Sequence, residues 1–212
     1  MCPDVMGRVL IVANGEWPSS FNLHHKRTTY DVLVALDGAA NRLLELNLIP
    51  DIIIGDLDSI TSTVLNQCES SGVQIVRIPS QDKSDISKGL QWVQQEQANA
   101  RIDIIGVEVG RYDHHLAAYS ALFECQSSAK ILLNGWTATR VDSKPTIFQI
   151  KPDAIISLIA FGSVQGVTLE GCQYPLHNAS LTTGTQGVSN KAIESEIVVS
   201  AQSGDLLLLI EG

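Results

Sequence analysis

The hydrophobic pattern of the first two-thirds of the chain alternates short apolar runs with longer amphipathic segments. Six of the apolar runs are rich in β-branched residues, have strand length and contain few polar residues, as expected for parallel strands covered on both faces. They are Val9–Ala13, Val32–Leu36, Ile52–Ile54, Val73–Ile78, Ile102–Val107 and Ile131–Leu133. Helices are expected between them at Ala39–Leu46, Ile60–Cys68, Ile86–Gln97 and His114–Glu124. This alternation predicts an α/β domain with a doubly wound parallel sheet and right-handed crossovers.

The pattern changes past about Val141. Strand-like runs then follow one another with short polar or glycine-containing links and without a helical stretch of normal length. The runs are Pro145–Ile150, Ile155–Phe161, Val167–Glu170, Ser195–Ser200 and Leu206–Ile210, with turns expected at Gly162-Ser163, Gly171 and Ser203-Gly204-Asp205. We therefore expect a smaller antiparallel β-sandwich domain at residues 143–212, after an α/β domain at residues 1–142.

Composition and charge narrow the class of protein. The 212 residues are 44% hydrophobic and 17% charged, which is enough for a core that needs no disulfides. Cys2, Cys68, Cys125 and Cys172 stand far apart, so we expect reduced thiols rather than a zinc or redox motif. A net charge of -9 without a basic run argues against a nucleic-acid partner. Because the chain shows no signal-peptide pattern and no membrane-length apolar run, we expect a cytoplasmic protein without a membrane partner.

Acidic residues gather where the predicted parallel strands end. Asp56 and Asp58 follow Ile52–Ile54, and Asp37 follows Val32–Leu36. Open α/β sheets bind ligands beyond the carboxyl ends of their strands, and the carboxylates of Asp56 and Asp58, two residues apart, repel one another unless a cation lies between them. Asp37 is expected to orient the metal waters or the nucleotide. The pattern favours a hard cation held against a polyphosphate. The alternative is that Asp37, Asp58 or Ser59 merely caps the helix that follows.

A second acidic cluster, Gln81-Asp82-Lys83-Ser84-Asp85, lies at a strand-to-helix junction, and Lys88 follows Ser84 by one helical turn. A carboxylate, a lysine and a free helix N-terminus together form a seat for a polyphosphate, because the backbone N–H groups there point at anions. The alternative is that Asp85 caps the helix or pairs with Lys88 at the surface.

A third cluster, Gly110-Arg111-Tyr112-Asp113-His114-His115, places a guanidinium just before a helix. The planar fork of Arg111 matches phosphate oxygens, while Asp113 is a candidate cap. The adjacent histidines point about 100° apart on a helix, so at least one of them is expected to pack or cap. Asn14-Gly15, after the first strand, resembles a phosphate-facing turn and is also ordinary turn chemistry.

Taken in order, five motifs resemble the thiamin pyrophosphokinase family over nearly the whole chain. They are Asp37-Gly38-Ala39-Ala40-Asn41, Pro50–Ser59, Gln81–Asp85, Gly110–His114 and Gly187-Val188-Ser189-Asn190. The resemblance implies a two-domain subunit in a homodimer whose active sites lie between subunits. It also implies transfer of a diphosphate from ATP to the hydroxyethyl group of thiamin in the presence of Mg²⁺, which gives thiamin diphosphate and AMP.

With this resemblance, the acidic and basic residues receive expected roles. Asp56, Asp58 and Asp85 are expected to hold Mg²⁺, and Arg111 and Lys88 to balance the charge that grows as AMP leaves. Asp82 or Asp85 is expected to accept the proton of the thiamin hydroxyl. Residues expected near ATP also include Asn14, Asp37 and Asp113, and those expected near thiamin are Gln81, Tyr174, Ser189 and Asn190.

Three positions depart from the family pattern, and three other functions stay open. Val109 replaces a frequent glycine, Ser84 the usual threonine, and Lys191 a frequent acidic residue. One alternative function is a pyrophosphokinase for another heteroaromatic alcohol, such as a hydroxymethylpterin. Another is a DHH-type metal-dependent phosphoesterase, suggested by Asp113-His114-His115, although that triad should end a strand. The third is a nucleotide-sensing module without turnover.

Overall fold

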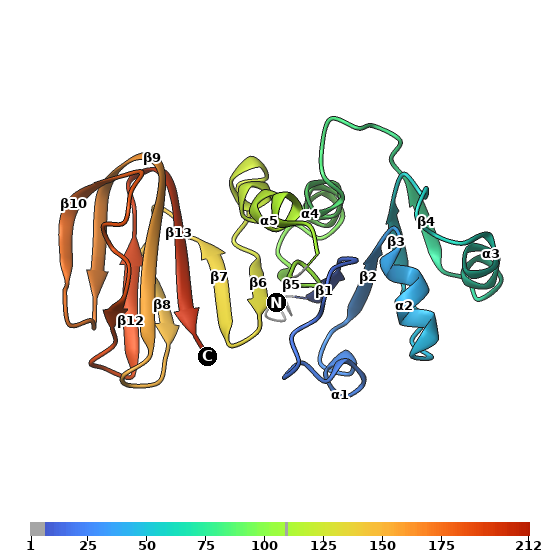
Figure 1. Ribbon diagram of the computed structural model, residues 1–212, viewed down its shortest axis with the longest axis horizontal. Helices are drawn as coiled ribbons and strands as arrows, with labels where there is room; N and C mark the ends of the chain where they lie inside the picture. Colours follow the sequence, from blue (N-terminus) through green and yellow to red (C-terminus); the bar gives the residue numbers. More distant parts are fainter. Residues whose placement is uncertain (1–6, 109) are drawn as a thin grey trace, which may run out of the picture. The chain divides into compact units, whose positions relative to one another are not determined.

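The computed structural model describes residues 7–108 and 110–212, and the chain forms two compact units, Met1–Asn134 and Gly135–Gly212 (Figure 1). The boundary between the units lies earlier in the chain than Asp142, where the change of hydrophobic pattern had predicted it. The reason is strand pairing: β7 (Trp136–Arg140) is antiparallel to β13 (Ser203–Glu211), so this strand belongs to the second unit.

In its described residues, the first unit has a sheet with the strand order β4-β3-β2-β1-β5-β6, in which every pairing is parallel. The strands are β1 (Arg8–Val12), β2 (Val32–Leu36), β3 (Ile52–Gly55), β4 (Gln74–Arg77), β5 (Arg101–Ile105) and β6 (Lys130–Leu133). The chain winds outward from β1 to β4 and then returns to the other side of β1 for β5 and β6. The prediction of a doubly wound parallel sheet is therefore confirmed, and its topological switch point lies between β1 and β5.

Helices cover both faces of this sheet. They are α1 (Leu23–Arg27), α2 (Ala39–Glu45), α3 (Ser62–Ser70), α4 (Asp85–Glu96) and α5 (Tyr112–Glu124). Leu10 and Leu33 of the strands pack in one cluster with Leu43 of α2 and Cys68 of α3. On the opposite face, Gly89 of α4 approaches the sheet closely, since a Cβ there would meet Leu36 Cδ2 at 2.7 Å. Figure 1 shows α4 and α5 together on that side, and no helix in the described ranges is long and apolar enough to cross a membrane.

The first residues of the helices test the alternative in which the candidate site residues only cap the helices that follow them. Thr61 caps α3 by accepting from the N–H of Val64, and Ser84 caps α4 by accepting from the N–H of Ser87. Helix α5 begins after Arg111 without a side-chain cap, and α2 begins after a glycine. The alternative in which Asp37, Asp58, Ser59, Asp85 or Asp113 caps the next helix is therefore wrong. Hydroxyl groups cap α3 and α4, and no side chain caps α2 or α5, which leaves the four aspartates for another role.

The second unit is antiparallel throughout its described strands. The path β7-β13-β9-β12-β8 is extended by β10 and β11, which also pair with β9. The remaining strands are β8 (Thr146–Gln149), β9 (Ile155–Glu170), β10 (Leu176–Thr182), β11 (Asn190–Lys191) and β12 (Glu196–Ser200). The prediction of an antiparallel β domain after the α/β domain is confirmed.

Strand β9 corrects one detail of the sequence prediction. A turn was expected at Gly162-Ser163, but β9 continues through it for 16 residues. Its first part pairs with β13 and its second part with β10 and β12, so one strand serves both layers of the domain. Positive φ values at Gly162 (85°) and Gly166 (67°) let the strand bend without ending.

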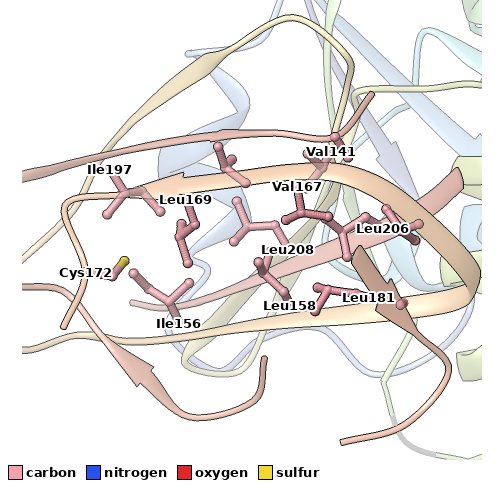
Figure 2. Packing of buried hydrophobic residues seen from close by; sticks show 14 of the residues in the cluster. Val141, Ile156, Leu158, Val167, Leu169, Cys172, Leu181, Ile197, Leu206 and Leu208 are labelled. Atoms are coloured by element: carbon pink, nitrogen blue, oxygen red, sulfur yellow. The ribbon is translucent and has the colours of Figure 1, made fainter. Parts of the chain in front are cut away.

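Alternate residues of these strands form the core of the second unit. Figure 2 shows Ile156 and Leu158 of β9 in one cluster with Leu208 of β13, Leu169 and Ile197. All five side chains are fully or almost fully buried. Such a core stabilises the unit by roughly 1.5–3 kcal/mol for each large apolar side chain, so the second unit needs no bound group to hold its sheets together.

Candidate active site

A cavity of about 640 Å³ lies in the first unit at the carboxyl ends of the parallel strands. Segments that follow β1, β2, β3 and β5 line it, together with the starts of α4 and α5. This is the switch point where doubly wound sheets bind ligands. Of the residues predicted from the sequence, Asn14, Asp37, Asp56, Gln81, Asp82, Asp85, Lys88 and Arg111 line this cavity.

Close backbone contacts between the segments after β1 and β5 form part of the cavity wall. The N–H of Ala13 donates to the carbonyl of Ile105 at 2.8 Å, and that of Gly15 donates to the carbonyl of Gly106 at 2.7 Å. A Cβ at Gly15 would collide with the Gly106 carbonyl oxygen, and one at Gly106 with the Ala13 carbonyl oxygen. Glycine is needed at both positions. Asn14, beside them, lines the cavity.

Three carboxylates meet at one point in this site. Asp37, Asp56 and Asp58 each offer an oxygen that lies within 4.8 Å of the others. Asp37 is only 5% exposed, and its Oδ1 has no hydrogen-bond partner among the described residues. Burial raises the pKa of the Asp37 carboxyl, against hydrogen bonds from Ser59 that lower it. A buried, unpaired carboxylate oxygen beside two more carboxylates fits a hard divalent cation such as Mg²⁺.

Neighbouring polar groups orient these carboxylates. Ser59 donates its N–H to Asp37 Oδ2 at 3.2 Å and its hydroxyl to Asp58 Oδ1 at 2.8 Å. Gln81 donates from Nε2 to Asp56 Oδ2 at 2.6 Å, and this hydrogen bond is the main cause of the lowered pKa of Asp56. Asp56 therefore stays ionised over a wide pH range. The expected contact of Gln81 with thiamin stays a prediction.

Asp85 and Lys88 form an ion pair at the start of α4. Lys88 Nζ lies 3.0 Å from Asp85 Oδ1, and the lysine side chain is 4% exposed. The alternative that Asp85 pairs with Lys88 is confirmed, although the pair lies in the cavity rather than at the surface. The structure groups Asp37, rather than Asp85, with Asp56 and Asp58. Asp85 is near enough for its charge to help raise the pKa of Asp37, and its role in metal binding stays a prediction.

Arg111 and Asp113 form an exposed two-point ion pair at the start of α5. Arg111 Nε and Nη2 donate to the two carboxylate oxygens of Asp113 at 3.1 and 2.6 Å, and this contact lowers the pKa of Asp113 to about 2. Asp113 thereby orients the guanidinium, which lines the cavity. Val109, which replaces a frequent glycine of the family pattern, lies outside the described residues.

The two histidines after Asp113 lie in different surroundings. His114 lines the cavity, while His115 Nε2 lies 2.9 Å from the hydroxyl of Tyr119 one turn along α5, which confirms a packing role for one of the two. Because the Asp-His-His triad lies in the first turn of a helix, it lacks the strand-end position that a DHH phosphoesterase requires.

The residues expected near thiamin in the second unit form a turn fastened by Asn190. Its Oδ1 accepts from the N–H groups of Tyr174 (3.1 Å) and Lys191 (2.8 Å), and its Nδ2 donates to the Tyr174 carbonyl (2.7 Å). The Asn190 amide is thus engaged with the backbone, while Tyr174 is 64% exposed. Ser189 is exposed, with a φ of 62° and its N–H donating to Ser157 Oγ. Contacts of these residues with the organic substrate stay predictions.

Two residues of α2 support the site without a role predicted from the sequence, although Asn41 belongs to the first family motif. Asn41 binds the segment after Asp58 through the carbonyl of Ser59. Arg42 donates to the Gly15 carbonyl and lies over the ring of Trp17, 4.3 Å from its centroid. Both residues belong to the first turns after a strand end, and this position was the available signal.

Comparison with known proteins agrees with this architecture. The sequence model described as "Thiamin pyrophosphokinase, catalytic domain" matches residues 23–134, and the one described as "Thiamin pyrophosphokinase, vitamin B1 binding domain" matches residues 146–206. The thiamine pyrophosphokinase of Bacillus subtilis is 28% identical over 211 residues, which cover 96% of this chain and 98% of the relative. Thiamin pyrophosphokinase 1 of Caenorhabditis elegans is 27% identical over 196 residues, covering 84% and 78%.

Solved structures agree as well. The crystal structure of a thiamin pyrophosphokinase family protein from Enterococcus faecalis superposes with a TM-score of 0.81 at 25% identity and covers 97% of this chain and 99% of that one. The thiamine pyrophosphokinase of Bacillus subtilis has a TM-score of 0.79, covers 96% and 98%, and shares the fold. Since the catalytic-domain model alone matches more than half of the chain and the second model follows it in order, this chain belongs to the thiamin pyrophosphokinase family.

Proposed function

We propose that this protein is a thiamin pyrophosphokinase, which moves a diphosphate from ATP to the hydroxyethyl group of thiamin and releases AMP. The observation that carries the proposal is the group formed by Asp37, Asp56 and Asp58 at the switch point, inside the segment that matches the catalytic-domain model. An unpaired oxygen on the buried Asp37 calls for a cation there. The neighbouring Lys88 and Arg111 supply positive charge for phosphate oxygens.

Asp56 and Asp58 hold Mg²⁺ in this proposal, with Asp37 as the third carboxylate and Asp85 as a further candidate. Bound Mg²⁺ neutralises part of the triphosphate charge and helps to align its reacting phosphorus. Gln81 fixes one oxygen of Asp56, and Ser59 fixes one oxygen each of Asp37 and Asp58. The remaining carboxylate oxygens are thereby presented in fixed directions.

Lys88 and Arg111 act on the phosphates. The bond that breaks joins the α- and β-phosphates, because AMP is the leaving group, so negative charge grows on the α-phosphate. Arg111 offers a planar fork that Asp113 already orients, and Lys88 offers a buried ammonium at the start of α4. Little covalent chemistry is asked of the protein in phosphoryl transfer, so positioning and charge supply most of the rate.

The thiamin hydroxyl must lose a proton as it attacks the β-phosphate. Asp82 and Asp85 both line the cavity. Asp85 already accepts from Lys88, whereas Asp82 accepts from the Ser80 hydroxyl at 2.8 Å. We therefore favour Asp82 as the base. An Asp82→Asn variant should lower kcat about 10²-fold, and an unchanged kcat in this variant would move the role to Asp85.

The second unit binds thiamin in this proposal, through Tyr174, Ser189 and Asn190. Support comes from the description of the domain model that matches residues 146–206. Tyr174 offers an exposed ring for stacking on the substrate, held by the clamp that Asn190 makes on its backbone.

We also propose a cytoplasmic homodimer with active sites between subunits. Several large apolar side chains are exposed, which suits contact with a second subunit. They are Tyr112 and Leu116 on α5 and Tyr174, Val188 and Ile193 in the second unit. Light scattering at assay concentration should give twice the 22.9 kDa chain mass, and a monomer would contradict shared sites. Fractionation of cells tests the location.

The proposed reaction is tested by incubating purified protein with ATP, Mg²⁺ and thiamin and measuring AMP and thiamin diphosphate together. Equal amounts of the two products are expected. A parallel reaction contains a hydroxymethylpterin in place of thiamin, and product from the pterin alone would change the substrate but keep the mechanism. Absence of AMP from both reactions would contradict the kinase and favour a nucleotide sensor.

A further inference from the structure

We infer that Asn41 is a positioning residue for the cation site, acting through Ser59 on Asp37 and Asp58; this inference rests on the proposed Mg²⁺-dependent function. Asn41 is not a member of the carboxylate group and offers no charge. Its side chain instead binds the segment that follows Asp58, so any effect on the cation must pass through that segment.

The Asn41 side chain forms hydrogen bonds with this segment at two places. Its Nδ2 donates to the carbonyl of Ser59 at 2.9 Å, and its Oδ1 accepts from the N–H of Thr61 at 3.0 Å and from the Thr61 hydroxyl at 3.3 Å. The helix that carries Asn41 is firmly anchored, because Ala39, Ala40 and Leu43 of α2 are fully buried. The buried helix α2 therefore holds the segment at Ser59 and Thr61 through both the Nδ2 and the Oδ1 of Asn41.

Ser59 transmits this restraint to the carboxylates. Each of its polar groups is engaged: the carbonyl with Asn41, the N–H with Asp37 and the hydroxyl with Asp58. On its other side, Ser59 packs against Gly38, where an added Cβ would lie 3.1 Å from the Ser59 Cβ. A shift of Ser59 would consequently change the directions of two of the three carboxylates.

The loop needs such a restraint because its own backbone does not favour this shape. Leu57, between Asp56 and Asp58, has a φ of 68°, a left-handed conformation that costs free energy for a residue with a branched side chain. Asp58 and Ser59 are exposed, so core packing does not fix them. Leu57 and Ile60 on either side pack against the core cluster that includes α2, and the contacts from Asn41 and Asp37 fix Ser59 between them.

Outer partners of metal ligands typically change metal affinity by about 10–100-fold when they are removed. We therefore expect Asn41→Ala to weaken cation binding about tenfold while the maximal rate at saturating Mg²⁺ falls by less than about threefold. A merely structural role would lower the melting temperature and leave the Mg²⁺ dependence unchanged.

The test is electron paramagnetic resonance of free Mn²⁺, titrated into protein with α,β-methylene-ATP, whose α–β link cannot be broken. Four variants are compared: Asn41→Ala, Asp58→Asn, the double variant, and Asn66→Ala on the exposed side of α3 as a matched control. Asn41→Ala should raise the Mn²⁺ dissociation constant about tenfold. The double variant should bind less weakly than the product of the two single effects, because part of the action of Asn41 passes through Asp58 and is already lost in Asp58→Asn. Asn66→Ala should bind like the wild type.

Asn41→Asp provides a second variant in case Asn41→Ala folds poorly. It keeps both acceptor contacts with Thr61 and turns a repelling oxygen toward the Ser59 carbonyl. It also adds negative charge near the site, so weaker Mn²⁺ binding by this variant cannot come from lost electrostatic attraction. Weaker binding supports the inference, and binding equal to or tighter than that of the wild type opposes it.

Wild-type affinity in Asn41→Ala, or effects that multiply in the double variant, would overturn the inference. Failure of the proposed function gives a different result: wild-type protein would then form no AMP, while the Asn41 variants still weaken Mn²⁺ binding. Wild-type protein that binds no Mn²⁺ with the nucleotide analogue would overturn both.

Discussion

The amino and carboxyl edges of the parallel sheet, where its strands begin and end, each hold a set of aspartates, and the two sets have different partners. Toward the amino edge, Asp103 accepts from the Tyr30 hydroxyl at 2.7 Å and pairs with Arg8 at 3.3 Å, and Asp51 pairs with Arg27 at 2.7 Å. At the carboxyl edge, Asp37, Asp56 and Asp58 converge, and none of them forms an ion pair with a described residue. The aspartates of the amino edge are therefore paired in the free protein, whereas these three are not paired with a described residue, although Asp85 and Asp113 near the same carboxyl edge do form ion pairs.

This difference separates stability from function. A carboxylate with an arginine and a hydroxyl partner holds neighbouring strands together, and its removal leaves those partners unsatisfied. A group of unpaired carboxylates lowers stability, so its presence in a folded protein indicates a ligand that completes it. Substitutions at the two edges should therefore affect different measurements.

Asp56→Asn should have the largest effect. We expect kcat/KM to fall about 10²–10³-fold, because a charged group aimed at the reaction centre is lost. The asparagine oxygen can still accept from Gln81, so the melting temperature should change by no more than about 2 °C. Steady-state kinetics at saturating Mg²⁺ and a thermal melt are the measurements. Normal turnover would remove Asp56 from the cation site.

Lys88→Met comes next and tests the one buried lysine of the cavity wall. We expect kcat to fall about 10²-fold, because the ammonium at the start of α4 no longer balances phosphate charge. Lys88→Arg keeps the charge with a different shape and should recover part of the rate. Equal rates in Lys88→Met and the wild type would mean that this lysine serves only to pair with Asp85.

Asp103→Asn, at the amino edge, should have the opposite result: lower stability with nearly unchanged activity. The substitution weakens a contact with Arg8 and one with the buried Tyr30 hydroxyl, so the free energy of unfolding should fall by about 1–3 kcal/mol. The value of kcat/KM should stay within about twofold, since no substrate is bound there. Urea denaturation and the AMP assay measure the two quantities. A large loss of activity at unchanged stability would contradict the division between the edges.

The effect of Asp37→Asn on stability should be the smallest, and it should depend on pH. Burial raises the pKa of Asp37 above its unfolded value, so the ionised carboxylate lowers stability at neutral pH. This cost disappears as the pH falls through the raised pKa and the group becomes protonated. The variant should therefore melt above the wild type at pH 7, and the difference should shrink toward pH 4. A difference that grows at low pH would have the wrong sign.

Much of the first unit could be predicted from the sequence because its physics is local. Strands covered on both faces must be apolar throughout, which made Val32–Leu36 recognisable with its observed bounds. Acidic residues directly after such strands necessarily lie at the ligand edge of the sheet. Asp56 was placed correctly in the cavity for this reason.

What could not be predicted depends on contacts between distant segments. Asp37 joins Asp56 and Asp58 only because Gly55 leaves room, since a Cβ there would lie 2.9 Å from the Asp37 Cβ. In the second unit, β10 carries exposed polar residues and showed no strand pattern. Strand β9 passes through glycines, so it was predicted as two shorter strands, Ile155–Phe161 and Val167–Glu170. The engagement of the Asn190 amide with the Tyr174 backbone joins residues 16 positions apart and left no local signal.

The central claim is that the incomplete carboxyl edge binds the cation with the nucleotide, and calorimetric titration tests it most directly. Mg²⁺ with α,β-methylene-ATP is titrated into the wild type, Asp56→Asn and Asp103→Asn. We expect the wild type and Asp103→Asn to bind with the same affinity and Asp56→Asn to bind more than tenfold more weakly. Equal affinity in all three proteins would show that the carboxylates of this edge do not hold the cation.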